Sequence, residues 1–188
     1  MAGTFFAGLS SEGFDRLGQP FLLPMLGDRP IELVFGALAV AAALGSIVVT
    51  GLVGRRLDTT RPRRVGRVLA VVDALTAAGM IGFGLSGGWW LYLLVRLLRD
   101  TATPITNVWL VSATTAGSRA TVFSIQAQAD ALGQIAGGPP VGVVAQRRSI
   151  GAGLSVAGLF LVPAVALFAL AARRSEPVRS DVVVEPLP

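Results

Sequence analysis

Long apolar stretches alternate with short polar links along the whole chain, and this pattern predicts an all-α bundle of membrane-spanning helices. Each stretch approaches or exceeds the length that a helix needs, at 1.5 Å per residue, to cross a hydrocarbon core of roughly 30 Å. The second and sixth stretches carry no charged residue and are the clearest spans. We expect spans over residues 4–26, 33–53, 68–85, 89–113, 120–145 and 150–172, followed by a disordered tail over 175–188.

The fifth stretch, from Arg119 to Ala145, carries polar groups that a simple membrane anchor would lack. Gln126, Asp130 and Gln134 recur at every fourth position, so they share one face of a helix. An ionisable residue within a span costs about 2.5–3.5 kcal/mol on insertion scales, which makes Asp130 a candidate for function. The alternative is an aspartate that only hydrogen-bonds a neighbouring helix.

Small residues form two further rows on the same stretch, and we expect a neighbouring helix to approach them backbone to backbone. Two adjacent prolines follow, and because they lack backbone donors they free carbonyl groups one turn earlier. Lipid cannot satisfy these carbonyls, so this end of the helix is expected to face protein. The residues are Ala129, Gly133 and Gly137 in one row, Gly138 and Gly142 in the other, and the prolines Pro139 and Pro140.

The first stretch is polar along one face about 100° wide. Glu12 and Arg16 stand at i and i+4 in the order that lets them neutralise each other. A span with a water-facing stripe fits this pattern, and the alternative is an amphipathic helix on the membrane surface. The short apolar lead-in also indicates a chain that is cut at its start. The stripe holds Glu12, Asp15, Arg16 and Gln19, whereas Phe14, Leu17 and Phe21 are expected to face outward.

The fourth stretch has a second polar face, and two such faces favour a shared interior. Pro104 deprives the carbonyl of Asp100 of its helical donor and predicts a kink there. Alternatively, Arg99 and Asp100 end a short helix in a loop. The face holds Arg96, Arg99, Asp100, Thr103 and Asn107.

The third stretch contains Asp73 among alanines and glycines, and this aspartate is either buried in the span or solvated near the membrane edge. A tight turn at Ser86–Gly88 precedes Trp89, Trp90 and Tyr92, which are typical of an aromatic belt at a membrane interface.

Composition supports a membrane protein and excludes several other classes. Of the 188 residues, 53% are hydrophobic and only 14% are charged, where soluble domains have about a quarter charged. The net charge of +5 comes largely from an arginine-rich loop over 55–67, which is a topology signal and not a nucleic-acid groove. Without cysteine or histidine the chain has no disulfide, no thiol nucleophile, no Ser-His-Asp triad and no usual zinc site. We therefore expect no catalytic residue, no metal and no cofactor, although paired Asp73 and Asp130 would in principle serve as acid and base.

The distribution of arginine predicts the orientation. Six spans place both termini on one side, where ten arginines lie, against three on the other side. Positive charges favour the cytoplasm, so we expect a multi-pass protein of the cell (inner or plasma) membrane with both termini cytoplasmic. If the first stretch does not span, the N-terminus moves outside and the rest keeps its orientation.

Four segments carry a resemblance to a known family. GQIAGGPPVG, from Gly133 to Gly142, is similar to the glycine-proline motif of the fifth helix in antiporters of the major facilitator superfamily (MFS) and of its repeat counterpart, the eleventh helix. GLVGRRLDTTRPRRVGR resembles the arginine-rich cytoplasmic loop after the second helix of each half. SEGFDRL and RATVFSIQAQADALGQ look like segments of bacterial efflux-type members. The chain therefore resembles the C-terminal six-helix half of an MFS transporter, with Gln134, Val143 and Arg55 as departures from the motifs.

The resemblance implies a transporter in which two six-helix halves rock around a midplane cavity, with the lipid bilayer and a small-molecule substrate as partners. One half needs another, so the chain is either the truncated reading or remnant of a twelve-helix protein, or a half that pairs with itself or with a separately encoded half; the short first stretch favours truncation. Proton-coupled efflux would use a buried carboxylate, with Asp130 as first choice. The expected pathway residues are Glu12, Asp15, Arg16, Arg96, Arg99, Asp100, Asn107, Gln126, Asp130 and Gln134. The rival function is a non-transporting membrane scaffold whose polar faces hold helices together.

Overall fold

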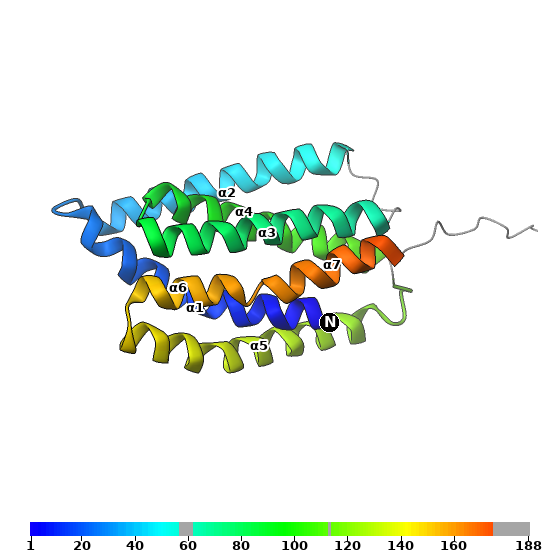
Figure 1. Cartoon of the computed structure of the whole chain (residues 1–188). Coiled ribbons are helices and arrows are strands. Elements are labelled where there is room, and N and C mark those ends of the chain that lie inside the picture. The colour runs from blue at the N-terminus through cyan, green and yellow to red at the C-terminus, as the bar shows by residue number, and fades with distance from the viewer. Residues whose placement is uncertain (57–61, 113, 175–188) are drawn as a thin grey trace, which may run out of the picture.

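The computed structural model describes residues 1–56, 62–112 and 114–174, which form a bundle of seven helices with no strand in these ranges (Figure 1). The helices are α1 (Ala2–Leu26), α2 (Ile31–Arg56), α3 (Pro62–Ser86), α4 (Trp89–Ser112), α5 (Arg119–Arg147), α6 (Ile150–Leu159) and α7 (Val162–Arg174). The predicted all-α fold is confirmed. The expected tail over 175–188 and part of the arginine-rich loop lie outside the described residues.

Helix boundaries differ most from expectation in two places. Helix α3 begins at Pro62, six residues before the predicted start at residue 68. Proline suits the first position of a helix because its fixed φ angle is close to the helical value. The sixth stretch, predicted as one helix, is broken between α6 and α7. Pro163 explains the break, because its nitrogen has no hydrogen to donate to the carbonyl of Leu159. The Leu161 N–H instead donates to the Gly158 carbonyl at 3.1 Å, which satisfies the backbone locally.

Three helical segments are long and apolar enough to cross a membrane: Ile31–Arg55, Arg63–Ser86 and Ile150–Arg173, the last running through the break. Polar side chains lower the hydropathy of α1, α4 and α5, which lie alongside these segments (Figure 1). The chain thus combines three membrane-type segments with three helices that are apolar on some faces and polar on others.

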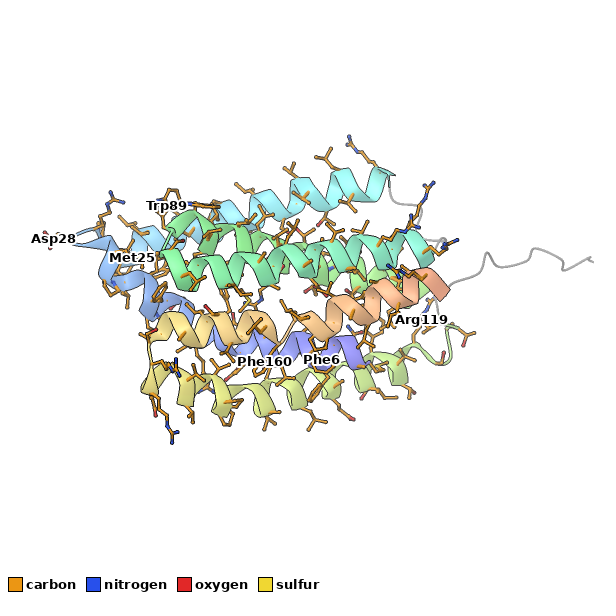
Figure 2. The ribbon with its side chains drawn as sticks, in the orientation of Figure 1. Phe6, Met25, Asp28, Trp89, Arg119 and Phe160 are labelled. Carbon is orange, nitrogen blue, oxygen red and sulfur yellow. The ribbon has the colours of Figure 1, made fainter. Side chains whose placement is uncertain are left out.

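The helices pack in a definite order (Figure 1). α1 packs against α5, α6 and α7, whereas α3 packs against α4, α6 and α7, and α2 lies on α4. The N-terminus lies at the end of the bundle where α7 ends. Asp28 and Trp89 lie at one end and Arg119 at the opposite end (Figure 2). The chain therefore reverses direction at each link between long helices.

The core is aromatic and aliphatic, and α1 contributes much of it. Phe14 is 2% exposed and stacks on Tyr92 with ring centroids 5.1 Å apart, and Phe21 meets Phe83 edge-on at 5.0 Å. The expectation that Phe14, Leu17 and Phe21 face outward is therefore wrong, because residues of α3, α4 and α6 cover these positions of α1. α1 is a member of the bundle and does not lie apart from it as a surface helix.

Candidate functional site

Two adjoining cavities lie between α1, α3, α4 and α5. The first is near the middle of these helices, and the second, which also borders α7, extends to Gly3 and Thr4 in the first turn of α1. Their volumes are about 270 and 340 Å³. They share one wall, formed by Ala7, Asp73, Ala102, Thr103 and Asp130. Residues from five helices thus meet around space that side chains do not fill.

The two cavities differ in chemistry. The first is bordered by the polar residues Asp15, Arg99, Asp100 and Gln134. The second is bordered by Asn107 and Gln126 but also by apolar and aromatic residues, namely Leu69, Phe123 and Phe168. A charged region therefore lies beside a mixed polar and apolar region.

An ion pair crosses the first cavity from α1 to α4. The Arg99 guanidinium donates to both carboxylate oxygens of Asp15, at 2.7 and 2.9 Å. Its central carbon also lies 5.2 Å from the centre of the Phe14 ring, a cation–π distance. The pair is open to the surroundings, since 54% of the Asp15 side chain and 28% of the Arg99 side chain are exposed. This places the predicted residues Asp15 and Arg99 together.

Asp130 accepts a side-chain hydrogen bond from its own helix and interacts electrostatically with Arg99 of α4. The Gln134 amide donates to Oδ2 of Asp130 at 2.8 Å, one turn further along α5. Gln126, one turn earlier, borders the second cavity, and its Oε1 is buried without a hydrogen-bond partner among the described residues. The three residues therefore face the cavities from one side of α5, as their spacing predicts.

Two of the predicted small residues bring α1 and α5 into close contact. A Cβ atom at Gly133 would collide with the Phe5 carbonyl oxygen, and one at Gly137 with the Leu9 carbonyl oxygen. Gly138 lies near the side chain of Glu12 with room for a Cβ atom, and no described atom lies within 4 Å of a Cβ built at Gly142. Backbone-to-backbone packing is therefore found for the first row, whereas no backbone within the described residues approaches the second row in that way.

Asp73 borders both cavities but is absent from the expected pathway residues. Its position near the middle of α3 and its 8% exposure rule out the alternative of a carboxylate solvated at the helix end. The sequence signal was present, because Asp73 is the one acidic residue within the segment Arg63–Ser86. What the sequence lacked was the position of α3 beside α4 and α1.

Other predicted residues lie apart from the cavities. Glu12 pairs with Arg16 along α1, and neither borders a cavity wall. Arg96 does not border either wall, and its Nε is buried without a hydrogen-bond partner among the described residues. Pro139 is exposed on the outer side of α5. The expected polar faces are real, but only part of each borders the interior.

The donor set does not fit a metal ion. Among the described residues, no group of three or more Asp, Glu, His or Cys side chains is arranged to hold one. The cavities instead offer carboxylates, amides and hydroxyl groups that can hydrogen-bond or neutralise an organic solute.

The chain matches no protein-family model, no curated protein and no solved structure.

Proposed function

We propose that this chain is one half of a membrane transporter that moves a small solute through the joined cavities. The observation that carries the proposal is the meeting of polar residues from four helices in a cavity at mid-bundle. Three membrane-type segments accompany these helices, and large apolar side chains such as Leu44 and Ile47 of α2 are exposed on the outside. Polar side chains inside a membrane span cost free energy. Their position beside a cavity therefore favours a role in solute passage.

In this proposal α1, α4 and α5 also cross the membrane, and α6 with α7 forms the sixth span. The count of arginines on the two sides favours cytoplasmic termini in the cell membrane. The glycine-proline and arginine-loop motifs support an MFS-type half. A second copy of the chain or a separate half would then complete the pathway.

Two observations disfavour the rival function of a scaffold held together by polar groups. The hydrogen bond of Asp130 is to Gln134 of the same helix, so it joins no two helices. Asp73 has no hydrogen bond or ion pair with any other described residue, so its carboxylate does not hold α3 to a neighbour. Asp15 and Arg99 do act between helices, but both border the open first cavity.

Cysteine labelling in intact membranes tests the water-filled pathway, and the natural absence of cysteine means that each introduced thiol is the only one. Thr103→Cys in the shared wall should react with N-ethylmaleimide, because water permits the thiolate to form. Leu44→Cys, on the exposed apolar side of α2, is the matched control and should not react. If neither cysteine reacts with N-ethylmaleimide, the result contradicts a water-filled pathway and favours the scaffold.

Transport itself is tested in inverted membrane vesicles that hold a pH gradient, read with acridine orange. A solute that exchanges for protons collapses the gradient, and a chemically varied panel of solutes identifies it. In the complete transporter Asp130→Asn should abolish this response at normal expression; an unchanged response removes Asp130 from the coupling mechanism. The size of the native product, read with an epitope tag after Pro188, decides whether the assay uses this chain or a longer protein.

A further inference from the structure

The joined cavities contain more acidic than basic groups. Four carboxylates border them, those of Asp15, Asp73, Asp100 and Asp130, whereas Arg99 is the one basic residue on either wall within the described part of the chain. Arg99 forms its two hydrogen bonds with Asp15, so these two charges neutralise each other. The carboxylates of Asp73 and Asp100 then have no basic hydrogen-bond partner on the walls, whereas Asp130 lies within electrostatic reach of Arg99.

Asp73 is the most unusual of them. It is 92% buried, being only 8% exposed, and forms no hydrogen bond or ion pair with any other described residue. The carboxylate oxygens of Asp73 are not completely buried, so they retain some accessible surface. Because the residue borders both cavities, this accessible surface opens into them. A buried carboxylate that lacks a protein partner is costly unless a ligand neutralises it.

The surroundings of Asp73 fit an organic ligand and not a metal ion. Three acidic side chains do not converge closely enough to hold a metal among the described residues. The cavities, at about 270 and 340 Å³, together reach the size of ordinary small-molecule pockets, which is roughly 300–1,000 Å³. On the second wall Phe123, Phe168 and Leu69 can pack against the apolar body of a ligand, and the aromatic faces also attract cations.

We propose that the joined cavities bind an organic cation with an apolar body, such as a hydrophobic amine or quaternary ammonium, with Asp73 as its main counter-ion and Asp130 as the second. This inference rests on the proposed function and gives its substrate class. Asp130 ranks second because the Gln134 amide already donates to one of its oxygens.

The test compares two probes of the same shape and opposite charge, the tetraphenylphosphonium cation and the tetraphenylborate anion. Binding of each radiolabelled probe is measured on the purified full chain in nanodiscs, with empty nanodiscs subtracted. Saturable binding of the cation without saturable binding of the anion is expected. Equal saturable binding of both probes, or none of the cation, would overturn the proposal.

Substitution then locates the counter-ion. Asp73→Asn keeps the shape of the side chain but removes its charge, and should weaken cation binding at least tenfold, whereas Asp130→Asn should weaken it less. Asp28→Asn makes the same chemical change in the turn between α1 and α2, far from the cavities, and should leave binding unchanged (Figure 2). Undiminished affinity in folded Asp73→Asn protein would refute the role of Asp73.

A second readout keeps Asp73 in place and so does not depend on the folding of its variant. Tetraphenylphosphonium should protect Thr103→Cys from N-ethylmaleimide at concentrations where tetraphenylborate does not. Absence of protection contradicts the proposal. If Thr103→Cys reacts with N-ethylmaleimide but the cation neither binds nor protects, the water-filled pathway stands and only the cationic substrate class falls. If Thr103→Cys does not react at all, the proposed function itself fails.

Discussion

Asp15 and Arg99 form a two-point ion pair between α1 and α4, two helices that make few other contacts with each other. The pairing is geometrically well matched, because Nη1 and Nη2 of Arg99 donate to separate carboxylate oxygens of Asp15. Both side chains are nevertheless partly exposed, so solvent reduces the free energy that the pair contributes. The pair is therefore better placed to fix the distance between two helices than to stabilise the fold strongly.

A double-mutant cycle of Asp15→Asn and Arg99→Gln should give a coupling free energy of about 0.2–1 kcal/mol. The measurement is unfolding in mixed detergent micelles. The pair Glu12 and Arg16 of α1 is the comparison, with an expected coupling of about 0.3–0.5 kcal/mol for an i, i+4 pair. A coupling indistinguishable from zero would contradict a stabilising contribution from the Asp15–Arg99 pair.

Replacing single glycines of α5 by alanine should change stability in opposite directions. Gly133→Ala forces a methyl group against the backbone of α1 and should lower the free energy of unfolding by about 1–3 kcal/mol. Gly142→Ala meets no described atom and should raise it by up to about 1 kcal/mol, because alanine favours the helix. Thermal unfolding of the two variants beside the parent chain gives the comparison, and equal effects would contradict the close α1–α5 contact.

Removal of the Asp73 carboxylate should stabilise the folded chain while it impairs ligand binding. Asp73→Leu keeps the branched shape of the side chain and eliminates a buried polar group without a partner among the described residues, while the adjoining cavities leave room for its larger methyl groups, so the free energy of unfolding should rise by about 1–3 kcal/mol. Asp28→Asn in the exposed turn should alter it by less than about 0.5 kcal/mol. A loss of stability in Asp73→Leu would mean that the carboxylate has a structural partner after all.

The start of α6 depends on a side-chain cap that α5 lacks. The Ala152 N–H donates to the Ser149 hydroxyl oxygen at 3.0 Å, whereas Ser118 forms no such bond at the start of α5. Ser149→Ala should therefore cost about 0.5–2 kcal/mol of unfolding free energy, near the lower end because the site is exposed. Ser118→Ala is the matched control and should cost less; a larger loss there would reverse the assignment of the cap.

Much of the fold follows from local patterns in the sequence. The spacing of polar residues on α5 places Gln126, Asp130 and Gln134 on one face, and the structure agrees because helical geometry alone fixes that relationship. The ion pair of Glu12 and Arg16 is similarly local. The relative positions of residues within one helix can therefore be predicted from the sequence.

What each face meets was not predictable, because it depends on neighbouring helices. Phe14 was expected to face outward on the assumption that one side of α1 borders lipid, but helices surround it. Asp73 gave the same signal as Asp130, a lone carboxylate in an apolar stretch, and only its place beside α4 shows that both border the same space. The break before α7 is not apparent from hydropathy, because Pro163 lies within a continuous apolar run.

The break between α6 and α7 is next to the first cavity. Leu161, within the break, is 4% exposed and borders that cavity, while Phe160 beside it packs against the core (Figure 2). A change in the angle between the two half-helices would thus displace Leu161 directly and alter the volume available to a solute. In the proposed transporter, the outer turns of α6 and α7 would transmit a change in bilayer thickness or tension to this cavity and so alter how tightly a solute is held.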